Sequence, residues 1–156
     1  MTTPLPLSDK YARLLALAVP ALLLGGAYIS EYGFGLFPCE LCWWQRYPHF
    51  VALVLAILSF AMPPKRVWVA LAGLAIAVSG AIGVFHAGVE YHWWESPLGC
   101  TATDPFAIEF VRCDEAAWTL WGVSLAGFNA LFSLGSAIAI WVLLLAREKA
   151  VGEKRA

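Results

Sequence analysis

Four apolar segments dominate the sequence, and each is long enough to cross a lipid bilayer. They lie at residues 11–29, 44–62, 67–89 and 126–146 and together make up more than half of the 156-residue chain. A membrane-spanning helix needs about 20 mostly apolar residues. Because 61% of the residues are hydrophobic and only 13% are charged, a soluble fold would lack the polar residues that cover its surface. The sequence therefore predicts one all-α integral membrane domain over residues 1–156, an antiparallel bundle of four transmembrane helices.

The basic residues are concentrated on one side of these segments. Eight of the ten lysines and arginines lie at the start of the first segment, between the second and third, or after the fourth; only Arg46 and Arg112 lie on the other side. Cytoplasmic loops carry an excess of Lys and Arg, so we expect both termini to be cytoplasmic. The two remaining loops, about residues 30–43 and 90–125, then face the periplasm of a bacterial inner membrane. The net charge of −1 gives no indication of nucleic-acid binding.

Small residues occur at several points in the apolar segments. The third segment is dense in Ala, Gly and Ser, the first contains Gly25-Gly26, and the fourth contains Gly135-Ser136-Ala137. In lipid, small residues let helix backbones approach each other closely. The pattern predicts a tight four-helix bundle.

All four cysteines lie in the two loops that we expect to face the periplasm. Cys39 and Cys42 are in the first loop, and Cys100 and Cys113 are in the second. The periplasm is oxidising, and a disulfide across two intervening residues closes too small a loop to stabilise much, so Cys-x-x-Cys is more typical of a redox couple. Two structural disulfides, or a zinc site built from four thiolates, are the alternatives. Attachment of a c-type haem is excluded because Trp43, and not His, follows the second cysteine.

Two further polar groups lie close to the predicted cysteine site. Arg46 follows Cys42 by four residues, so both lie on one face of a helix that starts near residue 43. Arg46 is either a polar anchor for a lipid-dissolved electron acceptor or an interfacial residue whose side chain extends to the lipid headgroups. His86 and Glu90 are likewise four residues apart at the outer end of the third segment. His86 is a weaker candidate for an acceptor contact or proton relay, and a polar cap at the membrane interface is the alternative.

The stretch "FPCELCWWQR" before an apolar helix, with "HAGVEYHWW" and two more cysteines in a second outward loop, resembles the disulfide bond formation protein B (DsbB) family. The resemblance covers nearly the whole chain. It implies an inner-membrane enzyme, a protein-dithiol:quinone oxidoreductase that supports disulfide bond formation. The implied partners are a periplasmic thioredoxin-like oxidase of the DsbA type, membrane lipid, and the respiratory chain reached through quinone.

The resemblance also implies roles for individual residues. Cys39 and Cys42 match the pair that passes electrons to ubiquinone or menaquinone, and Arg46 matches the arginine that helps to hold the quinone. Cys100 and Cys113 match the pair that takes electrons from the DsbA-type partner, with Cys100 as the sulfur that the partner attacks. The resemblance implies no metal.

Two other functions remain open at the level of sequence. An enzyme similar to vitamin K epoxide reductase would also combine a four-helix bundle, a quinone and two cysteine pairs. In that family, however, the Cys-x-x-Cys pair follows the loop pair, whereas here it precedes it. A non-enzymatic membrane subunit with two structural disulfides is the second alternative.

Overall fold

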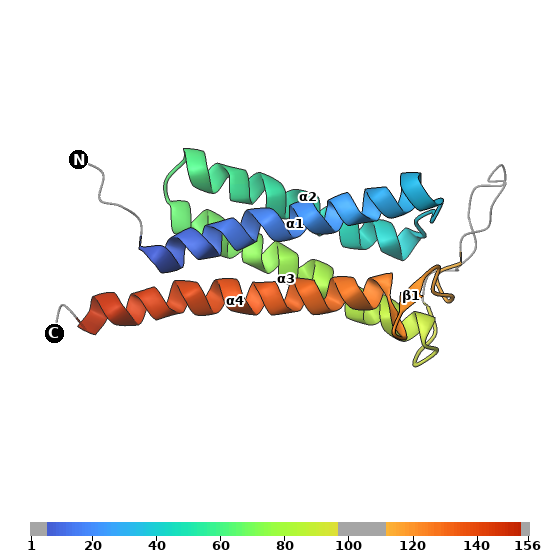
Figure 1. Ribbon diagram of the computed structural model, residues 1–156. Coiled ribbons are helices and arrows are strands. Elements are labelled where there is room, and N and C mark those ends of the chain that lie inside the picture. Colours follow the sequence, from blue (N-terminus) through green and yellow to red (C-terminus); the bar gives the residue numbers. More distant parts are fainter. Residues whose placement is uncertain (1–5, 97–111, 154–156) are drawn as a thin grey trace.

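The apolar segments form long helices that run back and forth along one bundle (Figure 1). The computed structural model describes residues 6–96 and 112–153, with side chains up to residue 146. The described part comprises α1 (Leu7–Phe34), α2 (Glu40–Ala61), α3 (Lys65–Glu90), β1 (Thr119–Leu120), β2 (Val123–Ser124) and α4 (Leu125–Glu153). The predicted all-helical fold is confirmed, apart from a two-stranded hairpin that the sequence analysis did not predict.

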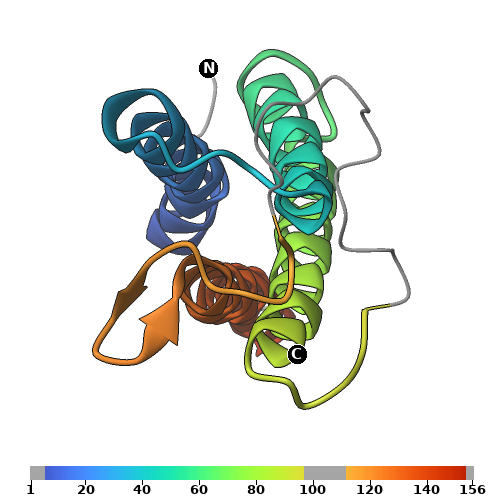
Figure 2. The same cartoon turned by 90° about the vertical axis from the view of Figure 1, so that its right-hand side faces the viewer.

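The bundle has two ends with different contents. The start of α1, the link between α2 and α3, and the far end of α4 lie together at one end (Figure 1); we call it the basic end, because it carries Lys10, Arg13, Lys65 and Arg66. Figure 2 views the bundle from the opposite end, where the α1–α2 link and the hairpin lie. We call this the cysteine end. In between, α3 packs along both α2 and α4, and α1 packs against α4 and α2.

Three of the described helices are long and apolar enough to cross a membrane: α1, α3 and the part of α4 from Leu125 to Ala146. The fourth predicted span, residues 44–62, overlaps α2, which does not reach the same apolarity. The reason is local, because the first half of α2 carries Gln45, Arg46 and His49. The structure is therefore compatible with a multi-pass membrane protein, and the count of four spans stays a prediction.

Close packing through glycine is clearest between α3 and α4. A Cβ atom added at Gly73, Gly80 or Gly83 would lie about 3 Å from atoms of α4 (3.1, 2.8 and 3.0 Å to the nearest). By contrast, Gly25 and Gly135 have nothing within 4 Å of such an atom. The glycines at these two positions therefore face open space, whereas alanines of the same two helices, such as Ala16 and Ala137, are buried between the helices.

The hairpin closes the cysteine end beside the start of α4. Trp121 and Gly122 both have positive φ angles, of 51° and 78°, as a two-residue turn between β1 and β2 requires. The hydroxyl of Tyr91, just after α3, donates to the carbonyl of Gly122 at 2.8 Å and accepts from the amide of Ser124 at 3.0 Å. The hairpin is thereby held against the end of α3.

Candidate active site

The two cysteines of the first loop meet at the start of α2. Cys39 is the N-cap residue, and its sulfur accepts a hydrogen bond from the amide of Cys42 at 3.3 Å. The two sulfurs lie 2.9 Å apart as thiols, with Cys39 donating to Cys42. This hydrogen bond, followed by burial and the neighbouring charge on Cys42, raises the pKa of the Cys39 thiol. The same hydrogen bond lowers the pKa of the Cys42 thiol, which lies in the first turn of α2 where the helix dipole favours an anion, so Cys42 is the more acidic of the two.

His86 of α3 lies on the other side of the cysteine pair. Its Nε2 is 3.5 Å from the Cys39 sulfur and 3.7 Å from a carboxylate oxygen of Glu90, so the two residues predicted to pair are in contact. Its Nδ1 is 2.8 Å from the side-chain nitrogen of Gln45, which also donates to the carbonyl of Leu41. Because Gln45 donates to Nδ1, the hydrogen of neutral His86 lies on Nε2 and points toward Cys39.

Cys113 of the second loop reaches the same place. It is buried with Cys39, Leu41 and Val89 in one apolar cluster, and a backbone hydrogen bond joins it to His86. The structure thus brings one sulfur of each predicted pair to the cysteine end. Cys100 lies outside the described residues, so its pairing with Cys113 stays a prediction.

Arg46 is buried and does not extend to the surface. Its guanidinium pairs with Glu31 of α1 at 2.6 Å and donates to the carbonyl of Ala27 at 3.4 Å. Its central carbon also lies over the rings of Tyr28 and Trp43, at 5.0 and 4.8 Å. The partner Glu31 was not predicted, because it lies just beyond the predicted first span, in the stretch expected to be a loop, and only the structure shows that α1 continues past it.

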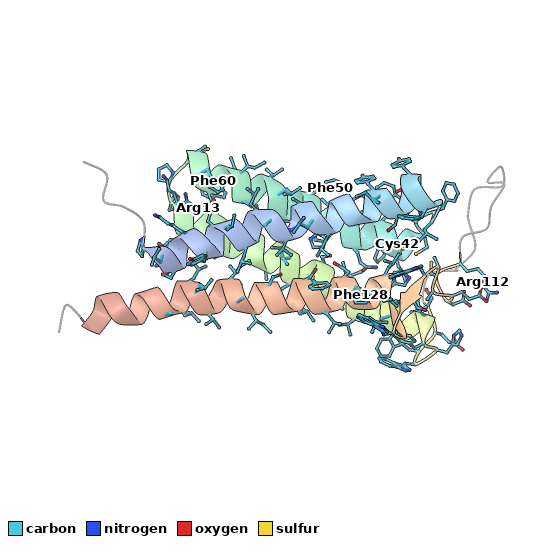
Figure 3. The ribbon with its side chains drawn as sticks, viewed as in Figure 1. Arg13, Cys42, Phe50, Phe60, Arg112 and Phe128 are labelled. Carbon is cyan, nitrogen blue, oxygen red and sulfur yellow. The ribbon has the colours of Figure 1, made fainter. Side chains whose placement is uncertain are left out.

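A pocket of about 240 Å³ lies between α1, α2 and α4 at the cysteine end. Its remaining walls are mainly aliphatic and aromatic, and its polar lining is Ser30, Cys42, Gln45, Arg46, His49 and Asn129. Figure 3 labels Cys42 and Phe128, both of which line the pocket, at the end of the bundle opposite Arg13 and Phe60. The pocket therefore unites two residues that the sequence singled out, Cys42 and Arg46. His86, the weaker candidate, does not line it.

A hydrogen-bond network joins three helices beside this pocket. Asn129 of α4 donates to the side-chain oxygen of Gln45 at 2.8 Å and to the carbonyl of Ser79 at 3.2 Å. Its own oxygen accepts from His49 at 2.9 Å and from Ser133 at 2.9 Å. Sequence analysis did not assign these residues to a site.

The thiol pair and His86 also form a group that could hold a metal ion. The two sulfurs and a ring nitrogen of His86 all lie within 4.8 Å of one another. Thiolate and imidazole are ligands that zinc accepts, but a structural zinc site has four protein ligands. The group found among the described residues has three, so the arrangement fits a redox pair with a hydrogen-bonding histidine better than a structural zinc site.

Comparison with known proteins agrees with this chemistry. The family described as "Disulfide bond formation protein DsbB" matches residues 9–143, which include all four cysteines and Arg46. The chain belongs to the DsbB family. The DsbB relatives include disulfide bond formation protein B of Marinobacter nauticus, 28% identical over 83% of this chain and 89% of that protein. Disulfide bond formation protein B of Stutzerimonas stutzeri is also 28% identical, over 88% of this chain and 96% of its own length. The chain matches no solved structure.

Proposed function

We propose that the protein is a protein-dithiol:quinone oxidoreductase of the bacterial inner membrane. In this proposal it reoxidises a soluble DsbA-type thiol oxidase in the periplasm and passes the electrons through two cysteine pairs to ubiquinone or menaquinone. From there they enter the respiratory chain. The observation that carries the proposal is that Cys42 and Arg46 line the same largely apolar pocket, which joins an electron-rich sulfur to a cation able to bind a carbonyl oxygen.

The pocket fits the head group of a quinone. Its volume of about 240 Å³ is below the roughly 300–1,000 Å³ of pockets that hold drug-sized ligands, so it suits a ring. Arg46 has five N–H donors, and its contacts with Glu31 and Ala27 leave donors for a carbonyl oxygen. A bound quinone would supply an acceptor of two electrons and two protons, and it would leave as quinol when Cys39 and Cys42 become a disulfide.

The residues around the thiol pair have separate tasks. Cys42 lines the pocket and delivers the electrons, because its position at the start of α2 favours the thiolate. Cys39 is turned toward His86 and Cys113, away from the acceptor. Arg46 holds the acceptor, and Glu31 holds Arg46.

Exchange between the two pairs follows from the burial of Cys39 with Cys113. When the partner's two thiols close to a disulfide, the Cys100–Cys113 disulfide opens to two thiols. These close again as the Cys39–Cys42 disulfide opens, so that two electrons and two protons move at each step. Nε2 of His86 lies 3.5 Å from the Cys39 sulfur, and its hydrogen can stabilise that sulfur while its bonds change.

The first test follows electron flow in purified protein supplied with a reduced DsbA-type oxidase and a short-chain quinone, with quinone absorbance as the readout. We expect one quinone to be reduced for each partner disulfide formed. Cys42→Ser should abolish quinone reduction. Cys100→Ser should stop partner oxidation, while the Cys39–Cys42 pair, reduced by a small dithiol, still reduces quinone.

Two outcomes would contradict the proposal. If Cys100→Ser oxidises the partner at the wild-type rate, the relay through two pairs is wrong. If Cys42→Ser still reduces quinone at the wild-type rate, the pocket is not the place where electrons leave the protein.

A further inference from the structure

The donors and acceptors of the network beside the pocket can be assigned one by one. The side-chain nitrogen of Gln45 lies 3.2 Å from the carbonyl of Leu41, and that of Asn129 lies 3.2 Å from the carbonyl of Ser79. A backbone carbonyl only accepts, so both side-chain nitrogens are donors. The side-chain oxygen of Asn129 is then an acceptor, and Nε2 of His49, 2.9 Å away, carries the hydrogen.

This assignment leaves Nδ1 of neutral His49 as an acceptor with nothing to accept from. The side chain is 3% exposed, and Nδ1 is buried without a hydrogen-bond partner among the residues that the structure describes. Buried polar atoms in native proteins nearly always have a partner. Since His49 also lines the pocket, a ligand in the pocket is the natural source of the missing hydrogen.

We propose that His49 is a further binding residue of this pocket, and that its Nδ1 accepts a hydrogen bond from a hydroxyl of bound quinol. The inference rests on the proposed function. An oxidised quinone offers only acceptor oxygens, whereas the reduced quinol offers two hydroxyl groups. His49 therefore distinguishes the product of the reaction from its substrate, which Arg46 does not, because a guanidinium donates to either oxygen.

The positions of Arg46 and His49 suit the two ends of one ring. Both line the pocket, and they are three residues apart on α2. The Arg46 guanidinium is turned toward Glu31 of α1 and the His49 ring toward Asn129 of α4, so the two side chains approach the pocket beside different helices. One oxygen then accepts from Arg46, and the hydroxyl at the other donates to His49. Tighter binding of quinol than of quinone favours electron transfer from the thiols to the bound ring.

The test measures binding and not turnover. In a Cys39→Ser/Cys42→Ser background, which cannot reduce quinone, the affinities for a short-chain quinone and for its quinol are measured under anaerobic conditions by equilibrium dialysis. Two substitutions separate the two nitrogens of His49. His49→Gln places an amide atom near Nε2 and keeps a partner for Asn129, but it removes Nδ1. His49→Asn keeps an acceptor near Nδ1 and gives up the contact with Asn129.

We expect the background protein to bind quinol more tightly than quinone. His49→Gln should weaken quinol binding about tenfold, which is the value of one hydrogen bond to a buried acceptor, and leave quinone binding unchanged. His49→Asn should keep most of the preference for quinol.

The outcomes separate this inference from the proposed function. If quinone binds and His49→Gln, shown to be folded by thermal unfolding, keeps the full quinol preference, the role of His49 is wrong while the quinone site stands. If His49→Gln does not fold, loss of the preference in His49→Asn overturns the inference in the same way. If neither quinone nor quinol binds to the background protein, the proposed quinone site fails, and the role of His49 fails with it.

Discussion

The two ends of the bundle are filled by different kinds of side chain. Toward the basic end, the four helices meet through alanines and branched aliphatic residues: Ala12, Ala16, Ala52, Ala56, Val69, Ala72, Ile76, Ala137, Ile140 and Leu144. Toward the cysteine end, α2, α3 and α4 meet through amides, imidazoles and hydroxyls: Gln45, His49, Ser79, His86, Asn129 and Ser133. The same helices are therefore held together by apolar packing toward the basic end, which we call the apolar half, and by hydrogen bonds toward the cysteine end, which we call the polar half.

The difference shows that the chain places its costly buried polar groups at the end of the bundle that holds the candidate active site. In lipid, apolar side chains pack without penalty, whereas each buried polar group needs a partner. An apolar core like that of the basic end would hold the other half together just as well. The polar half instead fixes the orientation of His86 through Gln45 and that of His49 through Asn129. These contacts determine which ring nitrogens carry a hydrogen. Fixed donors and acceptors of this kind are what a reaction that moves charge requires.

Arg46→Ala should give the largest effect, because it removes the fixed cation of the polar half. The loss of a charge-assisted hydrogen bond is worth about 1.5–3 kcal/mol, or roughly a ten- to hundredfold rise in the apparent KM for quinone. Arg46→Lys keeps the charge with fewer donors and should retain part of the activity. Steady-state quinone reduction over a range of quinone concentrations checks both variants.

The basic end supplies a matched control for this experiment. Arg13 is also largely buried and lies over an aromatic ring, that of Phe60, at 4.8 Å. Arg13→Ala should leave the KM for quinone unchanged, and exchange of the second cysteine pair with the partner should be unaffected in either variant. Equal KM values for quinone in folded Arg46→Ala and Arg13→Ala would show that Arg46 does not contribute to quinone binding.

Sequence analysis predicted the features that depend on near neighbours in the chain. The helices follow from apolar length, and the shared face of Cys42 and Arg46 follows from a spacing of four. It missed the features that depend on contacts between helices. Glu31 meets Arg46 from 15 residues away, and Asn129 meets His49 from 80 residues away. No local pattern marks these partners, because one polar residue in an apolar helix does not reveal which helix it will face.

Asn129→Leu should give the second-largest effect, a loss of thermal stability, because it replaces a hydrogen-bonded side chain of the polar half by an apolar one. The new side chain is similar in size, but it leaves the oxygen of Gln45 without a partner among the described residues and Nε2–H of His49 with only the longer contact to the Ser133 hydroxyl at 3.4 Å. An orphaned buried group costs about 1–3 kcal/mol, so the variant should unfold at a lower temperature in detergent. Ile140→Leu is the control in the apolar half, where a volume-conserving change costs less than about 1.5 kcal/mol.

The stability ranking of these two variants tests the comparison directly. If Asn129→Leu is as stable as Ile140→Leu, hydrogen bonds do not hold the polar half together and its packing resembles that of the basic end. Recovery of the unfolding temperature after two further substitutions, which remove the Gln45 and His49 side chains, would show instead that unpaired polar groups, and not lost packing, caused the loss of stability.

The smallest predicted effects come from replacing glycines of α3 by alanine, which compares how closely α3 and α4 pack in the two halves. Gly73 and Gly83 both let α3 approach α4, one in each half. A Cβ at Gly83 would lie 3.0 Å from the backbone atoms Ala126 O and Ala130 N, whereas one at Gly73 would meet side chains of Ile140 and Trp141 at 3.1 and 3.2 Å. Backbone in a helix cannot move aside, but side chains can. Gly83→Ala should therefore cost about 1 kcal/mol, at the low end of the usual penalty for overpacking, and Gly73→Ala should cost less.

Gly25→Ala completes the glycine series, because nothing lies within 4 Å of a Cβ at that position. Alanine is favoured over glycine inside a helix by roughly 1 kcal/mol, so this variant should be as stable as the wild type or more stable. The measurement is the thermal unfolding temperature of the three purified variants in one detergent. A larger drop in unfolding temperature for Gly73→Ala than for Gly83→Ala would mean that the apolar half is the more rigid of the two. The polar half would then owe its order to its hydrogen bonds alone, and not to the close approach of the α3 and α4 backbones.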